Sequence, residues 1–160
     1  MTNPTTITME PGLPFVDVVR EFDATPDDLY RAQTDPRLIE KWLGPRELET
    51  RVDEYDARVG GTYRYVNVAP DGSEYGFRGV FHTVEPGRLV IQTWEFDGFP
   101  GLATLETATY EDLGGRTRFT THSVYPSVEA RDGAAASGMT HGIEDSMARL
   151  DDVLASNAAR

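Results

Sequence analysis

Three histidines are the residues of this sequence best suited to acid–base chemistry, yet none of them lies in a recognisable catalytic motif. His82, His122 and His141 fall in separate segments, and no pair has the spacing of a zinc site. Cysteine is absent, which excludes disulfides, thiolate metal ligands and cysteine nucleophiles. The sequence also contains no nucleophile elbow, P-loop or dinucleotide-binding glycine motif. We therefore predict no metal and no cofactor.

Two of the histidines could still act with a carboxylate. His122 falls on a predicted strand and His141 at the start of the last predicted helix, so both could reach one end of the fold. Glu95 or Glu106 nearby would then complete an acid–base pair. We favour the simpler interpretation, in which the histidines are surface or hydrogen-bonded residues and the charges mark the wet face of a sheet. The sequence assigns no catalytic residue and leaves open whether the protein is an enzyme.

Aromatic residues are concentrated between Gly60 and Phe96. Tyr63 and Tyr65 share one strand face because side chains alternate along a strand. Such rings either fill a core or line a cavity. Together they favour a cavity, since buried tyrosine hydroxyls need polar partners that a pocket supplies. The pattern does not reveal which strand face points inward. The candidate ligand-binding residues are Trp42, Tyr63, Tyr65, Phe77, Phe81, Trp94, Phe99, His122, Met139, Ile143 and Met147.

Capping signals predict two short helices directly after a first strand at Phe15–Ala24. Thr25 and Asp35 are each followed by proline, which combines an N-cap side chain with the residue preferred at the first helical position. The first helix is predicted over Pro26–Gln33, and the second ends at Gly44. Two helices of about two turns each therefore separate the first strand from the rest of the chain.

Six further segments have the composition of strands and are separated by glycine-containing turns. Links this short join antiparallel neighbours, because a parallel crossover needs far more chain. The segments therefore predict a meander. They are Leu48–Arg58, Thr62–Ala69, Glu74–Glu85, Arg88–Phe96, Leu102–Asp112 and Thr117–Tyr125.

The C-terminal part of the sequence predicts one long helix, preceded by a small, flexible stretch over residues 129–142. Met139, Ile143, Met147, Leu150 and Leu154 form one apolar stripe at helical spacing. Only this helix is large enough to cover a face of the sheet. The predicted fold is α+β: a bent, seven-stranded antiparallel sheet wrapped around the long C-terminal helix. We assign residues 13–157 to a single domain and residues 1–12 to a flexible N-terminal arm.

The element order and five stretches carry a family resemblance across most of the chain. The stretches are Arg20–Pro45, Arg58–Val66, Pro70–Phe96, Gly114–Ser123 and Gly138–Leu154. The chain resembles the START/polyketide-cyclase/birch-pollen-allergen superfamily of helix-grip proteins (SRPBCC). The most similar branch is homologous to the activator of the heat-shock-protein-90 ATPase.

The resemblance implies a mainly apolar cavity between the sheet and the last helix. We therefore expect the protein to bind a small hydrophobic molecule whose identity the sequence does not define. Two alternatives stay open, because a fold does not determine function. One is a cyclase- or dehydratase-like enzyme on the same scaffold. The other is a chaperone-associated protein-binding module, which the single domain argues against, since the eukaryotic activators carry an additional domain. A homodimer is compatible with each of them.

Composition excludes several other classes of function. The chain of 160 residues has a formal net charge of −12, which disfavours nucleic acid and anionic membrane surfaces as partners. No segment approaches the ~20 apolar residues of a membrane-spanning helix. The N-terminal residues lack the basic start and apolar core of a secretory signal. The sequence thus predicts a cytoplasmic protein without membrane insertion.

Overall fold

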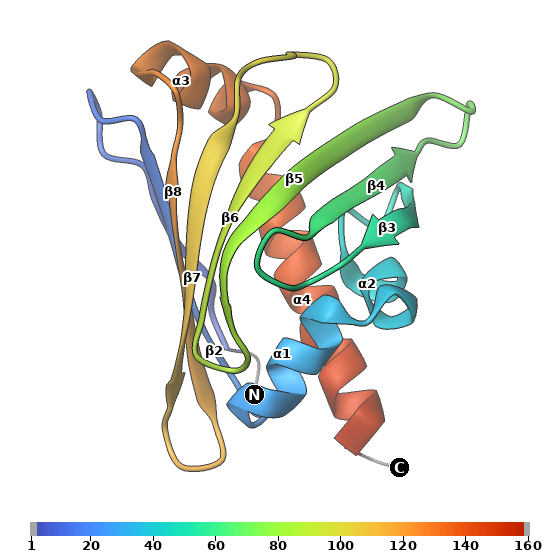
Figure 1. Ribbon diagram of the computed structural model, residues 1–160, viewed down its shortest axis with the longest axis vertical. Coiled ribbons are helices and arrows are strands. Elements are labelled where there is room, and N and C mark those ends of the chain that lie inside the picture. Colours follow the sequence, from blue (N-terminus) through green and yellow to red (C-terminus); the bar gives the residue numbers. More distant parts are fainter. Residues whose placement is uncertain (1–2, 159–160) are drawn as a thin grey trace.

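An eight-stranded antiparallel sheet forms the body of the protein in the computed structural model, which describes residues 3–158 (Figure 1). The strand order is β1-β2-β8-β7-β6-β5-β4-β3, so β3 to β8 form the predicted meander and β2 joins it beside β8. The strands are β1 (Thr6–Thr8), β2 (Phe15–Phe22), β3 (Glu49–Tyr55), β4 (Thr62–Val68), β5 (Glu74–Glu85), β6 (Leu89–Phe96), β7 (Thr104–Asp112) and β8 (Thr117–Val124).

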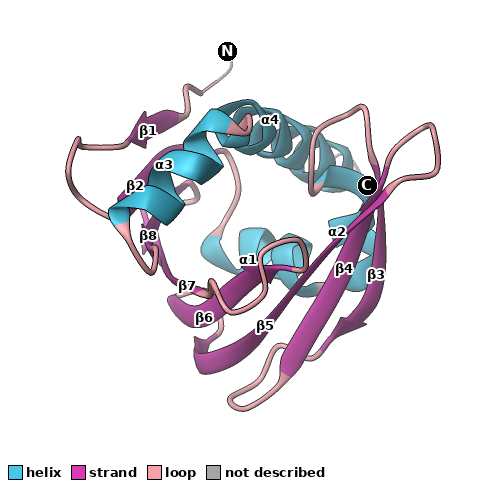
Figure 2. Cartoon of the chain, turned by 90° about the horizontal axis from the view of Figure 1, so that it is seen from above, coloured by secondary structure: helices cyan, strands magenta, loops and turns pink. Residues whose placement is uncertain are grey.

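Long helix α4 (Met139–Ala158) lies across the open side of the bent sheet (Figure 2). Short helices α1 (Pro26–Thr34) and α2 (Pro36–Trp42) contact it, and α3 (Val128–Ala136) precedes it. The predicted grip of a sheet around its last helix is therefore confirmed. No helix among residues 3–158 is long and apolar enough to cross a bilayer.

The caps of α1 and α2 form as the sequence predicts. The Thr25 side chain accepts a hydrogen bond from the backbone N–H of Asp28 at 3.2 Å. The Asp35 carboxylate accepts one from the backbone N–H of Arg37 at 3.0 Å. Each cap satisfies a donor that a helix N-terminus otherwise leaves without a partner, so both helices begin where their prolines stand.

Two elements were not predicted. Strand β1 lies in the arm that we expected to be flexible, and it makes the sheet eight-stranded rather than seven-stranded by pairing with β2. Helix α3 replaces part of the stretch expected to be flexible. Ser127 caps it by accepting from the backbone N–H of Ala130 at 3.0 Å. Buried Arg131 then anchors it by donating to the backbone carbonyls of Phe15 and Glu10.

The core lies between the inner face of the sheet and the helices. Leu150 of α4 is fully buried, as the apolar stripe predicts, together with Phe22 of β2 and Leu29 of α1. Strand register decides which side chains share this face, because residues opposite each other in neighbouring strands point the same way. The buried cluster comprises Phe22, Leu29, Ala32, Trp42, Tyr63, Tyr65, Phe81, Val90, Tyr110, Phe119, Met147, Leu150, Val153 and Leu154.

Candidate ligand-binding site

A row of stacked aromatic rings crosses the inner face of β4, β5 and β6. The centroids of Tyr65 and Phe77 are 5.1 Å apart, and those of Phe77 and Trp94 are 5.2 Å apart. Tyr63 continues the row at 6.2 Å from Tyr65. Tyr65 stands opposite Phe77 in the register of β4 and β5, so alternation brings these rings to one face. Together they form one apolar wall, which we call the aromatic wall (Tyr63, Tyr65, Phe77 and Trp94).

The polar groups of the aromatic wall form hydrogen bonds with each other and with the backbone of β6. The Tyr63 hydroxyl donates to the backbone carbonyl of Thr93 at 2.5 Å. The Trp94 indole N–H donates to the Tyr65 hydroxyl at 2.9 Å. These bonds hold the rings in place, because each bond fixes the angle of the side chain that donates it. The Tyr65 hydroxyl is the acceptor in this bond, so its O–H group can still donate a hydrogen bond to another group.

Glu106 of β7 brings a carboxyl group to the same inner face. It stands opposite Gln92 of β6 and Ser123 of β8 in the sheet register. The Ser123 hydroxyl lies 3.5 Å from its carboxylate, at the limit of a hydrogen bond. Burial raises the pKa of Glu106 to about 7. Within residues 3–158 no arginine, lysine or histidine forms an ion pair with this carboxyl group.

Several inward-facing side chains are surrounded by protein but remain partly accessible to solvent. Burial raises the pKa of Tyr55 and Tyr65 well above the usual range of a tyrosine. Nevertheless Tyr55, Phe77, Trp94 and Glu106 each keep part of their surface accessible. A side chain that is surrounded by protein and still partly accessible borders a space that solvent can reach. The polar and aromatic side chains of this face therefore have the chemistry of a binding site.

The last helix contributes apolar side chains opposite the sheet. Met147 is buried in the core cluster, and Ile143 packs against that cluster while staying partly accessible. Met139 begins α4, and its sulfur receives a hydrogen bond from the Tyr125 hydroxyl at 3.0 Å. Trp42 is buried, and its indole N–H donates to the backbone carbonyl of Ala32 at 2.9 Å, so it ties α2 to α1.

Two predicted cavity residues lie elsewhere, and their assignment is corrected. His122 is on the outer face of the sheet, because its neighbour Ser123 stands opposite Glu106 on the inner face. Its ring nitrogen lies 2.6 Å from the Asp17 carboxylate instead. Phe99 belongs to the loop after β6 and is 63% exposed. A residue in that loop follows no strand alternation, so the sequence pattern could not place it.

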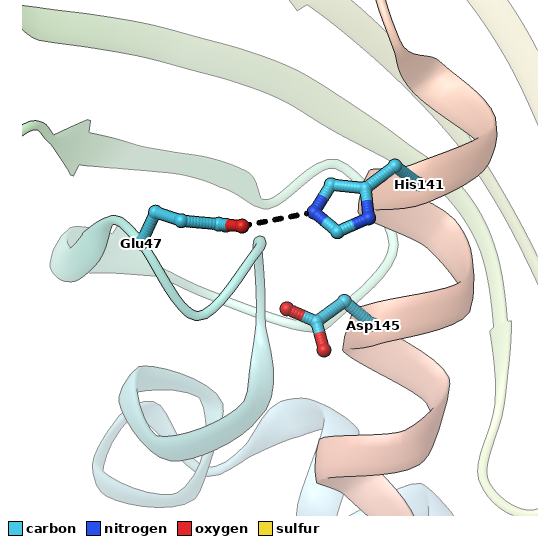
Figure 3. Close-up of side chains that lie close together, drawn as sticks. All are labelled: Glu47, His141 and Asp145. Atoms are coloured by element: carbon cyan, nitrogen blue, oxygen red, sulfur yellow. Dashed lines mark hydrogen bonds and ion pairs between the residues drawn. The ribbon is translucent and has the colours of Figure 1, made fainter.

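The predicted meeting of histidines and carboxylates inside the fold does not occur. Glu95 faces outward, where its carboxylate pairs with Arg78 at 3.0 Å. His141 is exposed on α4 and contacts Glu47 at 3.1 Å (Figure 3). Glu106 is therefore the one member of the predicted acid–base set that faces the interior.

Glu47, His141 and Asp145 bring three potential metal-ligand atoms within 4.8 Å of one another (Figure 3). The Asp145 carboxylate is already occupied, because it accepts from the backbone N–H of Arg46 at 2.5 Å and from its guanidinium at 3.1 Å. A cation would have to displace that guanidinium charge. The cluster acts instead as part of a link between α4 and the segment before β3.

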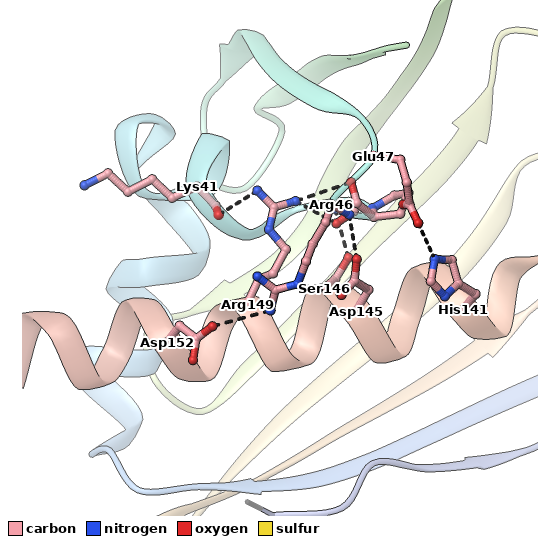
Figure 4. A network of polar contacts seen from close by, with 10 residues as sticks. Lys41, Arg46, Glu47, His141, Asp145, Ser146, Arg149 and Asp152 are labelled. Carbon is pink, nitrogen blue, oxygen red and sulfur yellow. Dashed lines mark hydrogen bonds and ion pairs between the residues drawn. The ribbon is translucent and has the colours of Figure 1, made fainter. Parts of the chain in front are cut away.

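That link continues along the side of α4 that faces the α2–β3 segment (Figure 4). Arg149 donates to the backbone carbonyls of Lys41 and Gly44, each at 2.9 Å. The Ser146 hydroxyl accepts from the backbone N–H of Gly44 at 2.8 Å. A surface groove of about 310 Å³ beside Arg149 is also lined by Lys41, Arg46 and Asp152. The network fastens the end of α2 to the helix that covers the sheet.

A bent antiparallel sheet closed by a long C-terminal helix, with an aromatic inner face, defines a helix-grip protein. The chain belongs to the family described as "Activator of Hsp90 ATPase homolog 1-like protein", which matches residues 23–155. This finding confirms the resemblance seen in the sequence. No curated protein matches the chain.

Solved structures of other proteins share the fold. A protein from Arthrobacter aurescens, solved by NMR, is 27% identical with a TM-score of 0.87, and the match covers 94% of this chain and 91% of that one. A crystal structure from Rhodobacter sphaeroides is 32% identical with a TM-score of 0.85, covering 94% and 99%. DynU16, from the dynemicin biosynthetic locus, is 21% identical with a TM-score of 0.65, covering 90% and 48%, and shows the fold alone.

Proposed function

We propose that the protein binds a small hydrophobic molecule between the inner face of β4–β7 and α4. The observation that carries this proposal is the aromatic wall, whose members Phe77 and Trp94 remain partly accessible on the same sheet face as Glu106. Ligand sites are typically apolar walls with a few convergent polar groups. Membership of a helix-grip family supports the same location.

Burial of the ligand against the wall supplies the driving force. Covering about 200 Å² of apolar surface contributes roughly 5 kcal/mol before the loss of ligand freedom is counted. The internal bonds of Tyr63 and Trp94 keep the wall in one arrangement, so little side-chain ordering opposes binding.

The first test is native mass spectrometry of protein purified from its own host, with organic extraction of any bound species. A discrete hydrophobic molecule in near-stoichiometric amount supports the proposal. Protein that is empty and also fails to take up any of a panel of apolar probes contradicts it.

Fluorescence then locates the bound molecule. Trp42 and Trp94 are the two tryptophans of the chain, and Trp94 belongs to the wall while Trp42 is buried among the helices. The ligand should change the emission of a Trp42→Phe variant, which reports on Trp94. It should leave the emission of a Trp94→Phe variant nearly unchanged.

Glu106 also favours a second candidate function, an enzyme of the cyclase or dehydratase type on the same scaffold. Such chemistry needs an acid or base that faces the substrate, and a carboxyl group whose pKa burial raises to about 7 is suited to transfer a proton near neutral pH. The test is product formation from hydrophobic carbonyl compounds, followed by mass spectrometry. The enzyme proposal requires that wild type forms a product and that Glu106→Gln does not.

The chaperone-associated role stays a prediction from the family description, as does a homodimer. Both are checked together by affinity purification from the host and by light scattering of the purified chain. Recovery of a chaperone in stoichiometric amount would make a protein partner the main function and the interior site secondary.

A further inference from the structure

The geometry points to a ligand that carries a protonated amine on its hydrophobic body, with Glu106 of β7 as the counter-ion that recognises it. This inference rests on the proposed function, because it takes the space beside the aromatic wall as the binding site. It adds the chemical class of the ligand. The carrying observation is an interior carboxyl group that has no basic partner.

The neighbours of Glu106 are neutral polar side chains rather than cations. Ser123 of β8 reaches it at 3.5 Å, and Gln92 of β6 stands opposite it. Burial keeps the surrounding tyrosines neutral, because it raises the pKa of each one, that of Tyr125 to about 12. The tyrosines close enough to be affected by the charge of Glu106 are Tyr55 of β3, Tyr63 and Tyr65 of β4, and Tyr125 after β8.

The basic residues of the interior are committed to other partners. Buried Arg20 pairs with Asp151 of α4 at 2.5 Å. Buried Arg131 donates to two backbone carbonyls and to Asp132. On α4 itself, Arg149 and His141 are bound to the α2–β3 segment, and the helix contributes Ile143 to the core. Within the described chain, no element packed around Glu106 therefore supplies a cation for it.

An ionised carboxylate in such surroundings is unfavourable until a positive charge arrives. A ligand ammonium supplies that charge and also carries three N–H donors, which the carboxylate and the neighbouring oxygens can accept. A carboxylate ligand would instead place two negative charges in one buried space. The site thus discriminates by charge, while the aromatic wall binds the apolar body without regard to charge.

The test compares amine, alcohol and carboxylate versions of two apolar bodies, an octyl chain and a naphthylethyl group, by isothermal titration calorimetry. At about pH 8, where Glu106 is ionised, the amine should bind about tenfold or more tighter than the alcohol, and the carboxylate weakest. Glu106→Gln should abolish this preference while alcohol binding persists. Glu95→Gln is the matched control, because that carboxylate lies on the outer face of a neighbouring strand.

Two further measurements show whether an effect of Glu106→Gln comes from the lost charge or from altered packing around the substituted side chain. The amine preference of wild type should fall as the pH is lowered through about 7, and that of Glu106→Gln should stay flat. Amine binding near pH 7 should also release up to about half a proton, seen as a dependence of the heat on buffer ionisation.

The outcomes distinguish the two proposals. If the alcohols bind as tightly as the amines and Glu106→Gln changes nothing, the amine inference is overturned and the hydrophobic site stands. If carboxylates bind tightest, the inference is likewise overturned. If none of the probes binds and protein from the host is empty, the proposed function falls and the inference falls with it.

Discussion

Replacing Glu106 by glutamine should change how the stability of the protein depends on pH, even with no ligand present. Burial raises the pKa of Glu106 from 4.5 to about 7 in the folded protein. As the pH rises, Glu106 therefore loses its proton at a lower pH in the unfolded chain than in the folded protein. The contribution of Glu106 to stability is fully present below about pH 4.5, falls as the pH rises, and is lost above about pH 7.

The magnitude follows from the two pKa values. Each tenfold change in a protonation equilibrium is worth about 1.4 kcal/mol, so the difference between 4.5 and about 7 amounts to roughly 3.5 kcal/mol in total. Glutamine has nearly the same shape and stays neutral at every pH. The free energy of unfolding of Glu106→Gln, relative to wild type, should therefore increase by roughly 2.5 kcal/mol between about pH 5 and pH 8.

Urea denaturation at closely spaced pH values measures this difference. Exposed carboxylates such as Asp97, whose pKa the neighbouring Arg64 lowers, act in the opposite direction, but they cancel when the variant is compared with wild type. Glu95→Gln serves as the control on the outer face of the sheet. Parallel curves for wild type and Glu106→Gln would refute the reasoning, because they would show that Glu106 is solvated in the folded protein.

Three further predictions concern the scaffold, and urea denaturation checks each. Asp151→Ala should destabilise by about 3 kcal/mol, because it strands the buried guanidinium of Arg20, whereas Asp152→Ala on the exposed side of α4 should change stability by less than about 0.5 kcal/mol. Gly79→Ala should destabilise by about 2 kcal/mol or more, since its Cβ would overlap the Tyr63 ring. Thr25→Ala should cost about 1 kcal/mol through loss of the α1 cap, and a larger loss would indicate a further role for that side chain.

The sequence predicted the elements whose signals are local. Threonine or aspartate before proline specified the starts of α1 and α2, and glycine turns separated the strands of the meander. The apolar stripe of α4 identified the covering helix, whose Leu150 is fully buried. Each signal depends on residues within a few positions of one another, so a single sequence is sufficient to read it.

The features that the sequence did not predict depend on contacts between segments that are distant in the chain. Along β7, Leu105 faces outward with 45% exposure while Glu106 faces the interior, the reverse of the usual hydrophobic pattern. Only pairing with β6 and β8 determines that orientation, so the sequence could name Glu106 without placing it. The same dependence misplaced His122. Strand β1 and helix α3 were missed because pairing with β2 and burial of Arg131 stabilise them.

The order of elements along the chain has a consequence for how the protein is made. Helix α4 follows every strand, and the pair that joins it to Arg20 spans 131 positions of the sequence. During synthesis the aromatic wall and Glu106 emerge well before the helix that covers them. Contacts between such distant positions form late in folding. If the proposed ligand meets the chain at that stage, α4 would enclose it as the helix docks against the sheet.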